Sequence, residues 1–199
     1  MEKGLLIVLS GPSGSGKGTV RSVLTEMEDF AFSVSATTRA PRAGETDGVD
    51  YHFITHESFQ EKIKNGEMLE YTTYNGNYYG TEFSEVLAAV EGGRNLILEI
   101  EVEGAMNVKR IYPEAVLIML LPPNFSEQER RLRGRGTENE EVIRGRLERT
   151  HTEMKYLPRY DYVVYNREIK TCAEEILSIV HAERCAIKRH ADAAKRYFE

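Results

Sequence analysis

Residues 5–19 read LLIVLSGPSGSGKGT, and this stretch decides the fold class. Leu5 to Leu9 form a continuous apolar run that stops at a Gly-Pro pair, which predicts a short strand buried on both faces. Small polar residues and glycines follow as far as Lys17. Residues 17–28 then place apolar side chains at the spacing of one helix face. A glycine-rich loop between a buried strand and a helix is the setting of a phosphate-binding loop.

This loop contains the residue types that hold a phosphate. Glycines let the backbone curl, so that successive N–H groups point at phosphate oxygens. The helix that follows presents its positive N-terminal end to the same anion, and Lys17 adds a positive charge for the β and γ phosphates of a nucleotide. A glycine-rich turn without a ligand is the alternative, and the flanking strand and helix disfavour it. We therefore expect ATP to bind at Gly11, Pro12, Ser13, Gly14, Ser15, Gly16, Lys17, Gly18 and Thr19.

The residue after the lysine departs from the general pattern of such loops. Position 18 is glycine, where the general pattern has a serine or threonine that binds magnesium. The hydroxyl comes one place later, at Thr19, so we expect Mg²⁺ to be held mainly by phosphates and water. The order Gly-Lys-Gly-Thr is common in kinases of nucleoside monophosphates.

Length and composition are those of one globular domain, or of one core with inserted lobes. Of the 199 residues, 41% are apolar and 29% are charged. The net charge of −6 argues against polymeric nucleic acid as a partner, since its binders are usually basic. The apolar run at 5–9 is too short for a signal sequence or a membrane span, so we expect no membrane contact and a cytoplasmic location. Cys172 and Cys185 lie in one expected helix and are expected to stay reduced.

Further strands and helices alternate along the chain. This alternation predicts an α/β fold with a parallel sheet covered on both faces, and the stretch from about 37 to 80 interrupts it. The expected strands are 32–34, 68–74, 95–101, 116–121 and 162–165, and the further helices are a short one near 56–63, then 82–91, two within 126–157 separated by Gly134 to Gly136, and a long amphipathic one at 170–197.

The segment that follows the first helix carries several linked motifs. Residues 32–45 read FSVSATTRAPRAGE, residues 48–53 read GVDYHF, and residues 76–80 read GNYYG. Together with the phosphate loop and GRGT at 134–137, this order of motifs resembles the guanylate kinase family. The resemblance runs from residue 5 to about residue 166. It implies phosphorylation of GMP to GDP, and of dGMP to dGDP, with ATP as co-substrate and Mg²⁺ as cofactor.

The same resemblance divides the chain into parts. It implies a three-layer P-loop kinase fold in a single domain over 1–199, either a monomer or a homo-oligomer. The expected parts are a core at 1–36, 81–124 and 156–199, a GMP-binding lobe at 37–80 and a helical lid at 125–155. Four apolar residues of the last helix could pack on the core or on a second subunit: Ile176, Ile179, Val180 and Ile187.

Two arginines in the expected lobe have the spacing to grip a phosphate. Arg39 and Arg42 flank a proline that stiffens the backbone, and two guanidinium groups can bind a phosphate monoester bidentately. Tyr51 and Tyr79 could donate hydroxyl groups to the same phosphate. The alternative is solvated arginines and packing tyrosines, but their joint match to the family pattern favours binding of the GMP phosphate.

Guanine presents two adjacent donors, its N1–H and its exocyclic amine, so carboxylates are suited to reading it. The resemblance assigns this role to Glu70 and Glu101. It assigns contacts with the base oxygen to Ser35 and Thr81.

The acidic segment after the strand at 95–101 departs from the family's common pattern, which has a final Asp and then a Gln-Gly pair. Here residues 99–104 read EIEVEG, so Glu101 is one methylene longer than Asp, and Glu103 replaces Gln. The resemblance places Glu99 beside magnesium-bound water. A carboxylate at a strand end can instead cap a neighbouring helix, and the division of roles between Glu99 and Glu101 stays open.

Seven arginines crowd residues 130–149. Some have a glutamate four residues away, a pair worth about 0.2–0.5 kcal/mol on a helix. Arg135 and Arg146 do not, and together with Arg131 they match the family's lid arginines. Phosphoryl transfer needs cations on the migrating group and exclusion of water, so the expected catalytic residues are Lys17, Arg39, Arg135 and Arg146. Arg131 is also expected at the ATP site, together with Asn166. The glutamate-arginine pairs are Glu127–Arg131, Glu129–Arg133 and Glu140–Arg144.

Three rival functions fit the sequence less well. A guanylate-kinase-like interaction module typically lacks a working phosphate loop, whereas Lys17 is present here. A regulatory GTPase would carry an Asn-Lys-x-Asp motif and an Asp-x-x-Gly switch, and the sequence contains neither. A kinase of another phosphorylated metabolite remains the third alternative.

Overall fold

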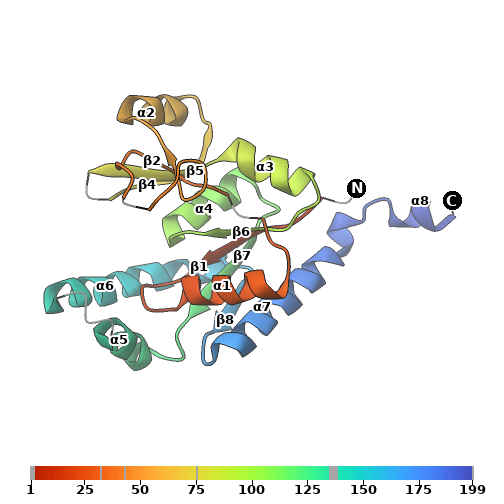
Figure 1. Ribbon diagram of the computed structural model, residues 1–199. Helices are drawn as coiled ribbons and strands as arrows, with labels where there is room; N and C mark the ends of the chain where they lie inside the picture. The colour runs from red at the N-terminus through yellow and green to blue at the C-terminus, as the bar shows by residue number, and fades with distance from the viewer. Residues whose placement is uncertain (1–2, 32, 43, 75, 135–138, 199) are drawn as a thin grey trace.

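A parallel sheet forms the core of the molecule (Figure 1). The structure is a computed structural model, and it describes residues 3–198 except 32, 43, 75 and 135–138. Within these residues the core strands have the order β6-β1-β7-β8, and every neighbouring pair is parallel. The strands are β1 (Leu6–Ser10), β6 (Leu96–Glu99), β7 (Val116–Leu121) and β8 (Tyr162–Tyr165).

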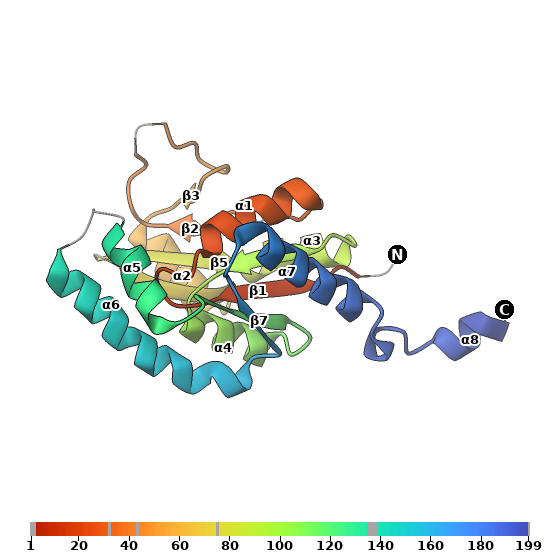
Figure 2. The ribbon, with the colours of Figure 1, turned by 90° about the horizontal axis from the view of Figure 1, so that it is seen from below.

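Residues 6–9 of strand β1 are apolar and buried because helices cover both faces of the strand. Ile7 packs among residues of α1 (Lys17–Met27) and α7 (Ile169–Arg184). Its neighbour Val8 packs among residues of α3 (Phe83–Glu91) and α4 (Val102–Ile111). Figure 1 shows α1 and α7 on the opposite side of the sheet from α4, and Figure 2 shows α1 and α4 on either side of β1. The predicted α/β fold with a sheet covered on both faces is confirmed.

A second sheet builds the lobe at the upper left of Figure 1. It has the strand order β3-β2-β5-β4 and mixes parallel and antiparallel pairs. Phe59 is fully buried against this sheet, in a cluster with Ala36 and Met68. The elements of the lobe are β2 (Ala36–Thr37), β3 (His52–Phe53), α2 (His56–Lys64), β4 (Met68–Tyr74) and β5 (Asn77–Glu82).

Two helices follow β7 and extend beneath the lobe in Figure 1. They are α5 (Phe125–Gly134) and α6 (Glu140–Glu153), and the 3₁₀ helix η1 (Met154–Arg159) continues from α6. The two helical patterns predicted within 126–157 are therefore confirmed. Of the residues predicted to separate them, Gly134 ends α5, while Arg135 and Gly136 lie outside the described residues.

Two expectations about the strands were wrong. Ser33 and Val34 are not in a strand, and Phe32 lies outside the described residues. The chain pairs instead at Ala36 and Thr37, which join the lobe sheet through β5. Strand β6 ends at Glu99, and α4 begins three residues later. The sequence did not predict this helix, because the acidic residues at 99 and 101 give no signal of a helix N-terminus. Its buried positions, Val102, Ala105 and Val108, recur every three residues.

The long C-terminal helix was also predicted wrongly, because α7 ends at Arg184. The 3₁₀ helix η2 (Ile187–Arg189) and the short α8 (Ala193–Phe198) follow it. Contacts distant in sequence stabilise the break, since Arg189 donates hydrogen bonds to the backbone carbonyls of Lys3 and Gly4. Of the four apolar residues expected to pack, Ile176, Ile179 and Val180 join the core, while Ile187 is exposed.

Replacing a fully buried core residue should cost far more stability than replacing the exposed isoleucine. Ile118 on β7 is fully buried among side chains of α1 and α7. Ile118→Ala should lower the free energy of unfolding by about 3 kcal/mol, because it leaves a cavity. Denaturant unfolding measures the change. The matched control Ile187→Ala should change the free energy of unfolding by less than about 0.5 kcal/mol, and an equal loss in both variants would contradict this packing.

Candidate functional site

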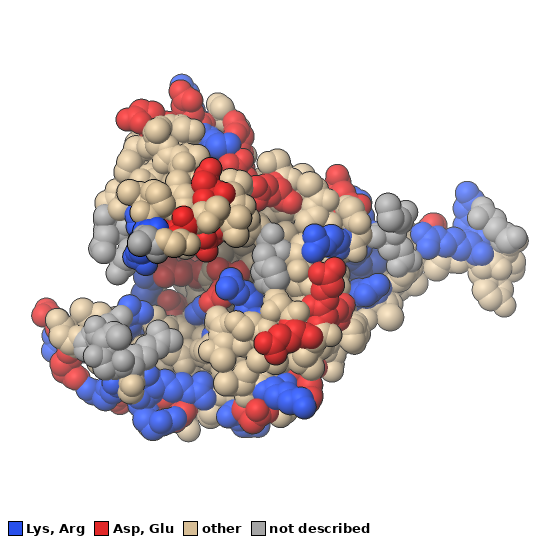
Figure 3. Space-filling view, viewed as in Figure 1, with Lys and Arg blue, Asp and Glu red and all other residues tan. Residues whose placement is uncertain are grey.

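A hollow separates the lobe from α5 and α6, and acidic and basic side chains line it (Figure 3). On the lobe side it contains a cavity of about 230 Å³. We call this cavity the acidic pocket, because four carboxylates line it. The lobe contributes Tyr51, Glu70 and Tyr79 to its lining, and Ser35 lies just before β2. The end of β6 and the segment after it contribute Glu99, Glu101 and Glu103. Ligands of α/β sheets bind where the carboxyl ends of strands open into such a crevice.

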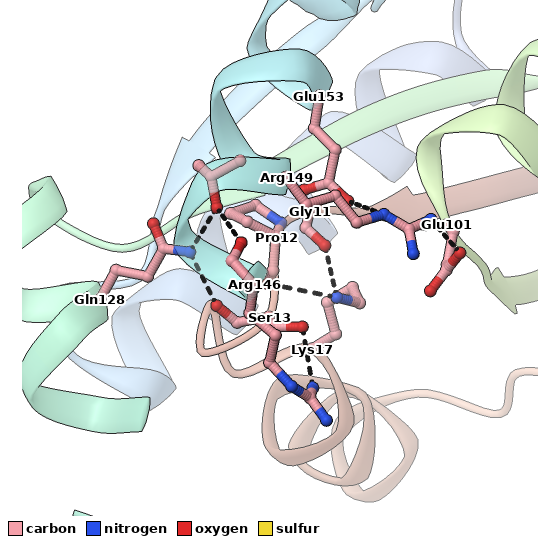
Figure 4. Close-up of polar contacts among 10 residues, drawn as sticks. Gly11, Pro12, Ser13, Lys17, Glu101, Gln128, Arg146, Arg149 and Glu153 are labelled. Carbon is pink, nitrogen blue, oxygen red and sulfur yellow. Dashed lines mark hydrogen bonds and ion pairs between the residues drawn. The ribbon is translucent and has the colours of Figure 1, made fainter. Parts of the chain in front are cut away.

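The loop between β1 and α1 curls around the amino group of Lys17. The Lys17 Nζ donates to the carbonyl of Gly11 at 2.6 Å (Figure 4). Gly14 and Gly16 have φ values of 84° and 91°, in the left-handed region that favours glycine. Of the nine residues expected to bind the nucleoside triphosphate, 11–16 form a tight turn after β1 and 17–19 begin α1, as a phosphate-binding loop requires.

Asn166 and Arg131 brace this loop from outside. The Asn166 Nδ2 donates to the carbonyl of Ser15 at 2.8 Å, and Arg131 Nη2 donates to the carbonyl of Asn166 at 2.9 Å. A Cβ atom at Gly16 would lie 2.4 Å from Asn166 Nδ2, so position 16 has no room for a side chain. Both residues expected near ATP therefore contact the phosphate loop or its immediate support.

The helices α5 and α6 also hold the loop, partly through residues that the sequence did not reveal. Arg146, an expected lid residue, donates to Ser13 Oγ at 3.0 Å. Gln128 is buried, and its Nε2 donates to the carbonyl of Ser13 at 3.0 Å and to Thr150 Oγ1 at 2.8 Å. Gln128 and Thr150 were not predicted, because a single polar residue on a charged helix gives no sign of burial.

Glu70 forms a polar group with Thr81 and Ser35 in the acidic pocket. Glu70 on β4 and Thr81 on β5 are paired neighbours in the lobe sheet. Thr81 Oγ1 donates to Glu70 Oε1 at 2.9 Å, and the hydroxyl groups of Ser35 and Thr81 are 3.3 Å apart. Burial raises the pKa of Glu70 to about 7, although the hydrogen bond from Thr81 opposes the rise. The structure thus brings together three residues that were expected to contact the base.

Glu99 lies beside the phosphate loop, at the end of β6. A Cβ atom at Gly18 would lie 3.9 Å from both of its carboxylate oxygens, and Arg21 Nε is 3.6 Å from Glu99 Oε2. Mg²⁺ binds carboxylates and phosphates while keeping several waters, so a carboxylate at this place fits a magnesium ion held by a bound nucleotide. Within the described ranges, no three His, Cys, Asp or Glu side chains group as ligands for a metal by themselves.

Arg39 is held in place by a carboxylate that the sequence did not reveal. Its two terminal nitrogens donate to the two oxygens of Glu45 at 2.8 and 2.9 Å. This bidentate pairing lowers the pKa of Glu45 to about 2. The Arg39 guanidinium lies 5.5 Å from the ring centre of Tyr51, and the rings of Tyr51 and Tyr79 are 6.1 Å apart. Three expected phosphate ligands thus meet, whereas Arg42 is exposed on the loop.

Glu101 contacts an arginine that was not predicted for the site. Its Oε2 accepts from Arg149 Nη2 on α6 at 2.6 Å (Figure 4). It lines the acidic pocket, but its side chain makes no capping hydrogen bond to α4. The capping alternative is therefore wrong for Glu101.

The remaining lid arginines form ion pairs. Arg131 and Arg133 contact Glu127 and Glu129 as their helical spacing predicted. Glu140 pairs with Arg133 rather than with the predicted Arg144. Arg135, expected to be catalytic, lies outside the described residues.

In the described part of the chain no helix is long and apolar enough to span a membrane.

Comparison with known proteins identifies relatives along almost the whole chain. A family model described as guanylate kinase matches residues 3–183. A guanylate kinase from Streptococcus thermophilus is 50% identical over 190 residues, which cover 94% of this chain and 91% of the relative. One from Bacillus cereus is 49% identical over 199 residues, covering 99% and 97%. The crystal structure of guanylate kinase from Anaplasma phagocytophilum superposes with a TM-score of 0.73 at 33% identity, covering 94% and 90%.

The raised pKa of Glu70 should make stability depend on pH. The folded protein holds this proton more tightly than the unfolded chain, whose usual pKa is 4.5. Stability therefore falls as pH rises from about 4.5 to about 7. Relative to Glu70→Gln, which cannot titrate, the wild type should lose about 1–3 kcal/mol of unfolding free energy between pH 5 and pH 8. Denaturant unfolding without nucleotide measures this difference. A constant difference would contradict the burial of Glu70, and the exposed Glu141→Gln serves as the control.

Proposed function

The chain belongs to the guanylate kinase family, and we propose that its hollow holds ATP on the phosphate loop and GMP in the acidic pocket. Its reaction is the ATP-dependent phosphorylation of GMP to GDP. The observation that carries the assignment of sites is that Glu99 lines the acidic pocket together with Glu70 and also lies beside Gly18 of the phosphate loop. We take residues 37–80 as the GMP-binding lobe and residues 125–155 as the lid.

Guanine fits the acidic pocket because its hydrogen-bond donors can face the carboxylates there. Glu70, when ionised, accepts the N1–H, and Glu101 accepts from the exocyclic amine. Ser35 and Thr81 carry hydroxyl groups that can donate to the base oxygen. Burial of Glu70 strengthens discrimination, because a base without a matching donor would leave a desolvated carboxylate unpaired.

The GMP phosphate is assigned to Arg39, Arg42, Tyr51 and Tyr79. Glu45 already holds the Arg39 guanidinium in a bidentate geometry, so a phosphate can approach an arginine whose orientation is fixed. The exposed Arg42 lies on the same loop and can also bind the GMP phosphate.

Transfer proceeds by in-line attack of a GMP phosphate oxygen on the γ-phosphorus of ATP. The bond between that phosphorus and the β–γ bridging oxygen breaks, and ADP leaves with the electron pair. The attacking oxygen is already ionised, so no side-chain nucleophile is needed. Lys17, Arg146 and Arg135 neutralise the charge of the migrating group.

Glu99 is assigned to the magnesium site. Glu99, beside Gly18, would hold Mg²⁺ through its water ligands, and the bound ion would supply positive charge at the ATP phosphates. The partners are the small molecules ATP and GMP, and the cytoplasm is the proposed location because purine nucleotide metabolism draws on both there.

The substrate itself is tested with a panel of acceptors. Wild-type protein with ATP and Mg²⁺ should phosphorylate GMP, with kcat/KM at least about tenfold above that for IMP, AMP, UMP, CMP or dTMP. Coupled measurement of ADP release quantifies each rate. Preference for any other acceptor would contradict the proposed reading of the base.

Removing the lysine of the phosphate loop should slow the transfer step. Lys17→Met should lower kcat by about 100-fold or more and leave the KM for GMP within about twofold, because the ammonium acts on the ATP phosphates. Steady-state kinetics measures both constants, and the exposed Lys64→Met is the matched control. Retention of more than about a tenth of the turnover would amount to less than about 1.4 kcal/mol, too little for this role.

Truncating the lobe arginines should affect the acceptor alone. Arg39→Ala should raise the KM for GMP by about tenfold or more, and Arg42→Ala should raise it less, because the Arg42 side chain is exposed. The KM for ATP should stay within about twofold, and weak guanosine binding should be insensitive to both changes. The exposed Arg94→Ala is the control. A loss of ATP affinity instead would show that these arginines serve the other substrate.

A further inference from the structure

One ion pair joins α6 to the acidic pocket. Arg149 Nη2 donates to Glu101 Oε2 at 2.6 Å, although the two residues are 48 positions apart (Figure 4). Arg149 lies three residues after Arg146, which contacts the phosphate loop through Ser13. A single helix therefore contacts the phosphate loop and the pocket for the base.

Glu101 depends on this contact for its orientation. It occupies the N-cap position of α4, but its side chain caps no backbone N–H there. Its negative charge adds to the rise in the pKa of Glu70, which shows that the two carboxylates act on one another. Like charges repel, so the cation of Arg149 beside Glu101 offsets the repulsion between the two carboxylates of the pocket.

Arg149 is itself held by a second carboxylate. Its Nε is 3.3 Å from Glu153 Oε1, and the Glu153 side chain is only 13% exposed. Burial raises the pKa of Glu153, while the charges of Arg149 and Lys17 oppose the rise. Two carboxylates thus fix the planar guanidinium of Arg149, which restricts how it can present its donors.

We propose that Arg149 is a positioning residue for base specificity, which holds Glu101 so that its carboxylate can accept from the exocyclic amine of guanine. This proposal rests on the proposed function. Arg149 donates to Oε2 of Glu101, and the second oxygen of that carboxylate can accept from the base. Because Arg149 belongs to α6, the contact also links base recognition to the helix that carries Arg146.

Fold stability does not account for this pair. The side chains of Arg149 and Glu101 are 51% and 56% exposed, and exposed pairs contribute little to stability. Losing the pair should therefore leave the thermal midpoint nearly unchanged while altering the choice of substrate. A merely structural residue would show the opposite result.

The test compares Arg149→Met and Arg149→Lys with wild type, using GMP and IMP, which differ in the exocyclic amine. Arg149→Met should lower the ratio of kcat/KM for GMP to that for IMP by about tenfold. The change should come through the KM for GMP, with the KM for ATP within about twofold. Arg149→Lys keeps a positive charge and should restore part of the ratio. Arg130→Met is the matched control, because Arg130 pairs with Glu127 on α5 and is 73% exposed.

A double-mutant cycle shows whether Arg149 acts through Glu101. In a Glu101→Gln background, adding Arg149→Met should not lower the ratio further. The inference is overturned if Arg149→Met leaves the ratio at its wild-type value, including the case in which kcat falls equally for GMP and IMP. An equal fall of kcat would indicate that Arg149 acts on the transferred phosphoryl group and not on the base. A wild-type protein that does not use GMP would overturn the proposed function as well, so the two failures are distinguishable.

Discussion

The curled phosphate loop, closed by its own lysine, is the feature on which the rest of the structure depends. Lys17 Nζ is held by the carbonyl of Gly11, and other loop carbonyls also need donors, since burying them unpaired is costly. Those donors come from distant parts of the chain: Asn166 follows β8, and Gln128 lies on α5. In the sheet β7 lies beside β1 and β8 lies beyond β7, which brings Asn166 close to the loop. The strand order that builds the core therefore also positions side chains that hold the phosphate loop.

Charged groups of the site have partners within the protein. Arg39 is paired with Glu45, and Glu101 with Arg149. A substrate therefore meets side chains whose positions are already fixed, which reduces the ordering cost of binding. Glu70 differs, because its nearest donor is a neutral hydroxyl and burial raises its pKa to about 7. The pocket thus holds a carboxylate that a donor from the base can stabilise in its ionised form.

The sequence predicted much of this molecule and missed the parts that depend on distant contacts. Strands at 116–121 and 162–165 were predicted to the residue, because apolar runs bounded by turn residues report burial directly. The break after Arg184 was not, since it depends on Arg189 reaching the other end of the chain. At the site, Ser35, Glu70 and Thr81 were found through motifs and do lie together. Gln128, Arg149 and Glu153 were missed, because polar residues on a charged helix show no pattern that reveals which of them faces a loop.

The central claim is that one hollow holds both nucleotides with their phosphates facing one another. Steady-state inhibition by adenosine and guanosine joined through a chain of phosphates tests it most directly. If both sites open into the hollow, this compound should compete with ATP and with GMP, and should bind more tightly than either, because the second contact becomes intramolecular. Competition with one substrate while the KM of the other stays unchanged would contradict the account.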